Sequence, residues 1–192
     1  MNLENKNDLK KKAFEILSDG VKNRDSLFHT LTLSTIDRGQ IDSRVMVLRE
    51  FVAKKRYLKF HTDQRSKKIQ EIKSNPVAAV IGYDPSQKIQ IRLQGNLSFS
   101  HQDNKTSEAW NASQHISKKC YSVKSGSSSV IKSPASYDFH IKDVNLEEGY
   151  KNFSILNFYF DSLEFLYLQR SGHRRCKFVW SKNKLESYWL VP

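Results

Sequence analysis

The stretch from Ile41 to Pro76 reads IDSRVMVLREFVAKKRYLKFHTDQRSKKIQEIKSNP. Residues 43–52 and 57–62 are rich in β-branched and aromatic side chains, a composition typical of strands. The residues between them, 53–55, predict a turn. The stretch therefore predicts two neighbouring strands, followed by a short helix that ends at the proline.

That helix is predicted over residues 65–74, because Ile69 and Ile72 form an apolar stripe at helical spacing. Thr62 or Asp63 is expected at its N-cap, since either side chain can accept a hydrogen bond from a free backbone N–H. The helix should stop at the following Asn-Pro pair, because a residue before proline is disfavoured in the helical conformation.

The first turn of this helix carries one hydroxyl and two amino groups, those of Ser66, Lys67 and Lys68. A helix N-terminus presents unpaired N–H groups and a partial positive charge, so it attracts anions. Cations there oppose the helix dipole by a few tenths of a kcal/mol. Their presence indicates an anion-binding site. A solvated basic face explains the same residues equally well, and both interpretations stay open.

The composition predicts one folded domain over residues 1–192, since 38% of the chain is hydrophobic and 11% aromatic. The formal net charge is +12, spread over short basic runs. Such a balance fits nucleic acid, an acidic surface or a phosphorylated ligand. Nucleic acid is the weakest of these hypotheses, because the aromatic residues alternate as core residues and do not interleave with lysines.

The location of the protein is predicted from what the sequence lacks. It has no apolar run approaching about 18 residues and no apolar segment near its N-terminus, so we expect neither a membrane span nor a signal peptide. Cys120 and Cys176 show neither metal-ligand spacing nor a disulfide framework. We therefore expect a cytoplasmic protein without a metal site.

The remaining elements are predicted in this order: a helix over 7–23 within an N-terminal segment 1–25, strands over 27–36, 77–83 and 88–99, helices within 103–121, a mobile serine-rich loop over 122–136, strands over 153–160 and 163–168, and a hairpin over 174–180 and 185–191. Antiparallel hairpins dominate this order. The fold class is therefore mainly β (α+β), a β-barrel with helices on its ends.

Some of these elements carry finer predictions. Residues 77–83 are nearly all apolar and predict a strand buried on both faces. Residues 88–99 alternate between apolar and polar, which predicts one buried face. The pair Asp161-Ser162 predicts a turn between the two late strands, and Trp110 and Ile116 are expected to face inward.

Four segments occur in a recognisable order: SRVMVLRE (43–50), KFHTDQRSKK (59–68), NPVAAVIGY (75–83) and IQIRLQG (89–95). Together they resemble the pyridoxamine 5'-phosphate oxidase superfamily, the FMN-binding split barrels. The resemblance implies an antiparallel split β-barrel with flanking helices, FMN as the cofactor, and a homodimer with FMN in clefts at the subunit interface.

The resemblance also implies a set of cofactor-binding residues: Arg44, Val45, Met46, Val47, Leu48, Arg49, His61, Thr62, Ser66, Lys67, Lys68, Gln90, Gln114, Arg175 and Lys177. The strand–helix junction, with Arg44, would hold the FMN phosphate. Residues 44–49 would line the flavin, and Gln90 would face its isoalloxazine ring. Gln114 would reach FMN from the partner subunit, and one of the last two residues of the set would stabilise the reduced ring. His61 stands where the family usually has Tyr.

Arg44 and Arg49 are five residues apart, so a regular strand would point them in opposite directions. A bulge, or a ligand that wraps the strand edge, is needed if both are to contribute.

The C-terminal segment 163–178, LEFLYLQRSGHRRCKF, departs from the authentic oxidases. Leu166 stands where they carry Trp, and the residues around His173 do not fall into their R-x-H-D-R substrate register. The segment is more similar to FMN-binding relatives that carry HRR here. The resemblance therefore leaves the substrate open, and whether pyridoxamine phosphate is oxidised does not follow from it.

Three functional hypotheses follow. The first is an FMN-dependent oxidoreductase, in which a small-molecule substrate passes hydride to flavin N5 and the protein supplies binding and electrostatics. No side chain is assigned a catalytic role. The second is a module that carries or senses a flavin without turnover. The third, a basic nucleic-acid-binding protein, is the weakest.

Overall fold

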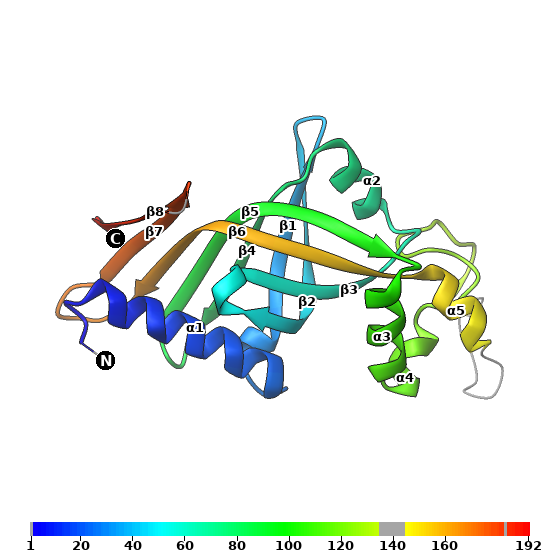
Figure 1. Ribbon diagram of the computed structural model, residues 1–192, viewed down its shortest axis with the longest axis horizontal. Helices are drawn as coiled ribbons and strands as arrows, with labels where there is room; N and C mark the ends of the chain where they lie inside the picture. Colours follow the sequence, from blue (N-terminus) through cyan, green and yellow to red (C-terminus); the bar gives the residue numbers. More distant parts are fainter. Residues whose placement is uncertain (1, 135–144, 183) are drawn as a thin grey trace.

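The computed structural model describes residues 2–134, 145–182 and 184–192 (Figure 1). Its strands are β1 (Thr30–Asp37), β2 (Gln40–Val52), β3 (Tyr57–Asp63), β4 (Val77–Asp84), β5 (Ile89–His101), β6 (Phe153–Tyr167), β7 (Arg174–Ser181) and β8 (Lys184–Leu190). Its helices are α1 (Lys6–Lys22), α2 (Lys67–Ser74), α3 (Asn104–Ala112), α4 (His115–Lys119) and α5 (Leu146–Asn152), with 3-10 turns η1 (Leu27–His29) and η2 (Ala53–Lys55).

The strands form one antiparallel sheet in the order β3-β2-β1-β4-β5-β6-β7-β8. β3 also pairs with β6, from Tyr57–Tyr159 to Asp63–Phe153, so the first six strands of that order close into a barrel. β7 and β8 extend the sheet beyond the barrel, close to both ends of the chain (Figure 1). The predicted fold class, a mainly antiparallel split barrel with flanking helices, is confirmed.

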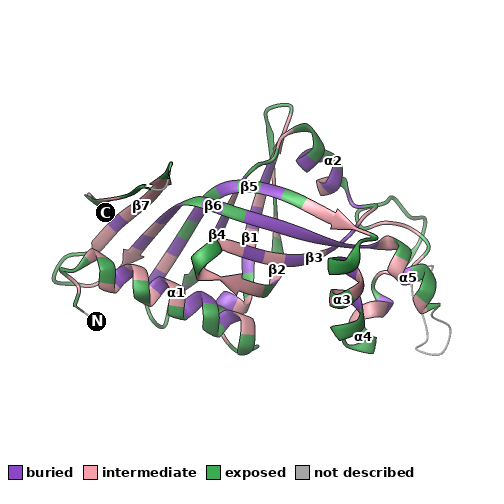
Figure 2. Ribbon diagram, in the orientation of Figure 1, coloured by how far each residue is buried: buried purple, intermediate pink, exposed green. Residues whose placement is uncertain are grey.

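The barrel interior holds most of the buried apolar side chains (Figure 2). The predicted alternation of the strand over 88–99 is confirmed, since Ile89, Ile91 and Leu93 are buried between more exposed polar neighbours. The prediction that 77–83 is buried on both faces is wrong. Val77 is 57% and Tyr83 46% exposed, and both lie on the face of β4 opposite the buried Ala78 and Val80.

A turn at Asp161-Ser162 was the second wrong prediction, because β6 runs through this pair as one long strand. Its pairing with β5 instead shifts register between Gln94 and Gly95, so that Asp161 is an extra residue in a β-bulge. A Cβ atom at Gly95 would collide with the Tyr159 carbonyl, which explains the glycine. The polar pair in the sequence marks a bend in one strand, not a connection between two.

The helices lie at two places on the barrel (Figure 1). α1 contacts β2, β6 and β7, and it buries Leu9, Ala13 and Leu17 against the core. α3, α4 and α5 gather at the end of the barrel where β5 ends and β6 begins.

Within that helical group, Trp110 packs against Phe153, Tyr121 and Tyr150, as its predicted inward orientation requires. Ile116 is 65% exposed, so the inward orientation predicted for it is wrong. α4 is one short turn, and only one side of it contacts the rest of the chain. The predicted loop over 122–136 and the hairpin turn near residue 183 lie partly outside the described residues.

No helix in the described ranges is long and apolar enough to cross a membrane. The same ranges contain no group of His, Cys, Asp and Glu side chains that could hold a metal ion. Cys120 and Cys176 are both free thiols.

Candidate functional site

The junction between β3 and α2 is held together by short polar side chains. Ser66 is the N-cap of α2, so the prediction of Thr62 or Asp63 at this position is wrong. The Ser66 hydroxyl donates to the Asp63 carbonyl at 2.6 Å and lies 3.3 Å from the Thr62 hydroxyl. The Lys68 ammonium donates to the same Ser66 oxygen at 3.0 Å. The predicted anion site is therefore a compact set of two hydroxyls and one ammonium group.

The gap beside this junction exists because β2 and β3 separate. Their pairing runs from Val52–Tyr57 only to Leu48–Phe60. Beyond that point β2 continues along β1, while β3 continues along β6. The strands leave an opening with Met46 on one side and His61 on the other, and this opening is the split of the barrel.

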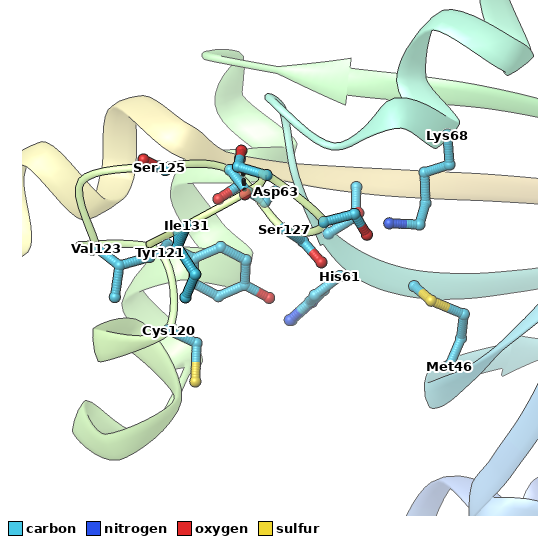
Figure 3. A pocket seen from close by; sticks show the side chains of 14 residues that line it. Met46, His61, Asp63, Lys68, Cys120, Tyr121, Val123, Ser125, Ser127 and Ile131 are labelled. Carbon is cyan, nitrogen blue, oxygen red and sulfur yellow. Dashed lines mark hydrogen bonds between the residues drawn. The ribbon is translucent and has the colours of Figure 1, made fainter. Parts of the chain in front are cut away.

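A first cavity of about 480 Å³ occupies the opening. Its strand side is formed by Met46, His61, Thr62, Asp63 and Lys68. Its other side is formed by residues 120–131, including four serines. Figure 3 shows Lys68 and Met46 on the side opposite Tyr121, with the Lys68 amino group and the Tyr121 hydroxyl directed toward the space between them. Burial raises the pKa of Tyr121, so its hydroxyl stays protonated at neutral pH.

Lys68 is the cation of the first cavity. Burial, followed by the nearby Arg44 guanidinium, lowers the pKa of its amino group. Within the described residues, no carboxylate lies within ion-pair distance of it. Asp63, Glu71 and Asp42 act on it only through longer-range attraction, so an anion in the cavity would further stabilise this partly buried positive charge.

Arg44 and Lys67 stand apart from the first cavity, because acidic side chains hold both of them. Arg44 donates to Thr35, to Glu71 at 3.0 Å and to Asp42 at 2.7 Å. Lys67 is 62% exposed and lies 3.3 Å from Glu71. Neither is among the described residues that line the cavity. The structure thus separates Lys68 from the two cations that the sequence grouped with it.

Arg65 attaches the serine-rich loop to the junction. Its guanidinium donates to both Asp63 carboxylate oxygens, at 3.0 and 2.7 Å. It also donates to the backbone carbonyls of Val123 and Lys124, at 2.9 and 3.2 Å. Gly126 packs so closely that an added Cβ would lie 2.7 Å from the Cβ of Arg65. The loop therefore forms a wall of the first cavity.

A second cavity of about 340 Å³ lies between β3 and the helices α3 and α4. Its charged lining residues in the described ranges are all basic: Arg24, Arg49 and Lys59. Its remaining lining residues are His61, Ala109, Ala112, Ser113, Gln114 and Ser117. Two predicted cofactor residues far apart in sequence, Arg49 and Gln114, therefore share one cavity.

The β-bulge required by the spacing of Arg44 and Arg49 is present. The β2–β3 register shifts between Leu48 and Glu50, so Arg49 is the extra residue. The bulge does not bring the two arginines to one place, however. Arg44 binds Glu71 near α2, whereas Arg49 lines the second cavity.

The residues over 11–101 match a family model described as pyridoxamine 5'-phosphate oxidase, FMN-binding domain. This part of the chain therefore resembles the FMN-binding domain of that family. A pyridoxine/pyridoxamine 5'-phosphate oxidase from Paraburkholderia phytofirmans (strain DSM 17436 / LMG 22146 / PsJN) is 25% identical over 122 residues, or 63% of this chain. The match spans only 55% of that relative's length.

Two solved structures resemble this chain over nearly its whole length. A pyridoxamine 5'-phosphate oxidase-related, FMN-binding protein from Nostoc punctiforme PCC 73102 has a TM-score of 0.75 and 19% identity, covering 95% of this chain and 97% of that one. PhzG from Burkholderia lata 383, in complex with tetrahydrophenazine-1-carboxylic acid, has a TM-score of 0.76 and 19% identity, covering 96% and 91%. At this identity the likeness establishes the fold alone.

The other predicted cofactor residues lie away from both cavities. Leu48 is fully buried in the core, and Val45 is 65% exposed. Gln90 pairs with Leu166, which in turn pairs with Arg175, and Lys177 follows on β7. These partners lie at the end of β6 opposite Ser154, the partner of Thr62. Within one chain, Gln90, Arg175 and Lys177 are therefore remote from the first cavity.

The sequence analysis missed Arg24, Lys59 and the contribution of the serine-rich loop. Lys59 could have been found, because it lies two residues before His61 and so on the same face of β3. Arg24 follows the end of α1 and reaches the cavity through tertiary packing, so no local pattern points to it.

Proposed function

We propose that this protein is an FMN-dependent oxidoreductase that accepts hydride from a small-molecule substrate at flavin N5. The observation that carries the proposal is the first cavity. On its strand side it combines the Thr62 hydroxyl with the partly buried Lys68 ammonium, and both residues lie inside the segment that matches an FMN-binding family. FMN, when bound, would supply the hydride acceptor.

The residues of the first cavity fit a phosphate group. Thr62 offers a hydroxyl donor, and Lys68 offers a charge-assisted donor whose burial makes an anionic partner favourable, whereas the Ser66 hydroxyl already donates to the Asp63 carbonyl. Met46 offers an apolar surface on the opposite side. We propose that Arg44 and Lys67 attract the phosphate by long-range electrostatics without contacting it, because their N–H groups are already paired with carboxylates.

We place the substrate in the second cavity. His61 lines both cavities, so molecules bound in the two would be neighbours. Arg24 and Arg49 favour a substrate that carries a carboxylate or phosphate, whereas Lys59 is already ion-paired with Glu50. We expect this chemistry in the cytoplasm, where the two free thiols would stay reduced.

We further propose a homodimer with FMN between the subunits. Gln90, Arg175 and Lys177 lie at the end of the barrel opposite Lys68, so they can contribute to the same flavin only from a second chain. Two-fold symmetry would then create two equal sites per dimer.

The test is the absorbance spectrum of the purified protein, taken before and after addition of FMN and desalting. We expect a retained flavin band at one flavin per chain. Loss of all flavin on desalting would contradict the cofactor assignment.

A flavin carrier without turnover is the second candidate function. The described residues of the cavities supply groups that bind and orient, and the pKa of His61 lies too low for it to act as a base near neutral pH. Anaerobic addition of a reduced nicotinamide separates the two functions. Bleaching of the flavin band supports the oxidoreductase, and an unchanged band supports the carrier.

A further inference from the structure

A cluster of charged side chains joins the β1–β2 hairpin to α2, which lies beside it (Figure 1). Its centre is Glu71, which is only 1% exposed. The Glu71 carboxylate accepts a hydrogen bond from Thr35 at 2.6 Å and another from Arg44 at 3.0 Å. The Lys67 ammonium lies 3.3 Å from the same carboxylate. A buried charge persists only with such partners, so Glu71 and its contacts belong to the folded framework.

Asp42 is the second carboxylate of this cluster, and its surroundings are different. It lies two residues before Arg44, so both side chains are on the same face of β2. Its carboxylate is 2.7 Å from the Arg44 guanidinium and 3.9 Å from the Lys67 ammonium. The Asp42 side chain is 47% exposed, and its backbone pairs with Thr35 whatever the side chain is. The fold therefore does not depend on this carboxylate as it does on Glu71.

The cluster lies close enough to the first cavity to act on its cation. Burial first, and then the Arg44 guanidinium, lower the pKa of Lys68, whereas the Asp42 carboxylate raises it. Lys67 is the first residue of α2 and directly precedes Lys68. Asp42 is therefore paired with two cations that lie within electrostatic range of the proposed phosphate site.

Asp42 takes the place that an external anion would be expected to take. A guanidinium and an ammonium group at the start of a helix are groups with which proteins bind phosphate. Here a carboxylate of the chain itself is paired with both. Slight burial raises the pKa of Asp42, but Arg44 and then Lys67 lower it further, so the side chain is ionised at neutral pH. An ionised Asp42 occupies the two cations and also repels an approaching phosphate.

We infer that Asp42 is an internal competitor of the phosphate, whose carboxylate keeps Arg44 and Lys67 from contacting the anion and so lowers the affinity of the junction for a phosphorylated ligand. The inference deepens the proposed function and rests on it, because that function places a phosphate beside Lys68. Asp42 then determines how strongly the protein prefers FMN to riboflavin, which has the same ring but no phosphate.

Fluorescence titrations with FMN and with riboflavin test this role. Asp42→Ala removes both the charge and the acceptor that Arg44 contacts. We expect it to lower the Kd for FMN about fivefold, the scale of one exposed ion pair, and to change the Kd for riboflavin less than about twofold. Asp42→Asn keeps the size of the side chain and removes only its charge. It should also lower the Kd for FMN, so the test does not depend on the folding of one variant.

Asp37→Ala is the matched control. Asp37 lies on the same hairpin, but it accepts a hydrogen bond from Ser74, at the opposite end of α2 from Lys67. The substitution removes the same charge farther from the two cations, so it should change the Kd for FMN less than about twofold. An effect as large as that of Asp42→Ala would overturn the inference, because any nearby carboxylate would then act alike.

A double-variant cycle distinguishes direct competition from long-range repulsion. In Asp42→Ala, the Lys67 ammonium is released from one of its two carboxylates and can reach the phosphate. Lys67→Ala should therefore raise the Kd for FMN at least about twice as much in that background as in the unchanged protein. Equal effects in the two backgrounds would overturn the inference. So would an unchanged or higher Kd for FMN in the Asp42 variants, or an equal gain in affinity for riboflavin.

The inference and the proposed function can fail separately. Binding of inorganic phosphate is followed by NMR through the backbone amide signals of α2. If the protein retains no FMN, but Asp42→Ala binds inorganic phosphate more tightly than the unchanged protein does, the cofactor is refuted and the inference stands. If FMN binds both proteins with the same Kd, the inference is refuted and the cofactor stands. Absence of both FMN and phosphate binding would overturn both.

Discussion

Lys67 and Lys68 are adjacent in sequence but have different surroundings. Lys68 is half-buried beside Ser66 and faces the first cavity, whereas Lys67 is exposed and lies near Glu71. Hydrogen bonds to charged groups contribute about 1.5–3 kcal/mol, but exposed ion pairs contribute at most about 1. The two lysines should therefore differ in what they contribute to anion binding.

We predict that Lys68→Ala raises the Kd for FMN about tenfold or more, while Lys67→Ala raises it less than about fivefold. Fluorescence titration of FMN measures both, and each variant serves as the control for the other. Equal effects on the Kd would mean that both lysines act through the overall positive charge at the start of α2, and that a direct bond from Lys68 to FMN contributes little. An unchanged Kd in the double variant would show that FMN does not bind its phosphate at this junction.

His61 should make the folded state sensitive to acid. Its folded pKa of about 3 lies below the unfolded value of 6.5, so between these pH values the unfolded chain binds a proton that the folded chain excludes. Stability is then complete above pH 6.5 and falls as the pH drops toward about 3, by at most about 1.4 kcal/mol per pH unit.

Urea unfolding at neutral pH and in mild acid measures this loss. We predict that His61→Phe loses less stability on acidification than the unchanged protein. His115→Phe, which replaces an exposed histidine, should lose as much as the unchanged protein does. If all three proteins lose the same free energy of unfolding on acidification, then the folded state does not keep His61 unprotonated.

At the scale of elements, the wall formed by the serine-rich loop depends on Arg65. This side chain connects Asp63, at the end of β3, to the carbonyls of Val123 and Lys124. We predict that Arg65→Ala speeds amide hydrogen exchange in residues 121–129 and raises the FMN dissociation rate. Arg170→Ala, at an exposed position after β6, is the control. Unchanged exchange in the loop would show that other contacts hold it.

The bulge between β5 and β6 depends on Gly95. A Cβ there would meet the Tyr159 carbonyl, which is backbone and cannot rotate away. We predict that Gly95→Ala lowers the free energy of unfolding by about 1–3 kcal/mol, the scale of an overpacked core. Urea unfolding checks this value. A loss no larger than that of an exposed strand substitution, Asn96→Ala, would mean that the bulge relaxes easily.

At the scale of the whole molecule, one flavin site should draw residues from two chains. Lys68 and Arg175 lie at opposite ends of the barrel, so we predict that Lys68→Ala and Arg175→Ala each weaken FMN binding when present alone. In a mixed dimer one site would lack both residues, and the other would have both.

After subunit exchange, tight FMN binding should therefore return to about a quarter of the sites. Light scattering confirms the dimer, and FMN titration counts the sites. Each variant taken alone through the same exchange procedure is the control, because neither should then show tight sites. If mixing with Arg175→Ala restores no tight sites, the site does not combine these residues across two chains.

The sequence by itself determined the barrel and the position of the strand–helix junction. Alternation on β5, the apolar stripe of α2 and the Asn-Pro stop are local patterns, and local backbone preferences and burial of one face are enough to produce them. The ordered motifs resembled the family whose model matches residues 11–101, and hydroxyl and ammonium groups were expected where the structure has them.

Only the tertiary structure decided which of these groups share a cavity. Charges near in sequence were separated, because Glu71 and Asp42 hold Arg44 and Lys67 away from Lys68. Distant residues such as Arg24, Arg49 and Gln114 were brought together by the packing of helices on β3. Which residues line a cavity depends on long-range packing and on the bulge in β2, which changes the direction in which its side chains point. Neither of these produces a periodic pattern in the sequence.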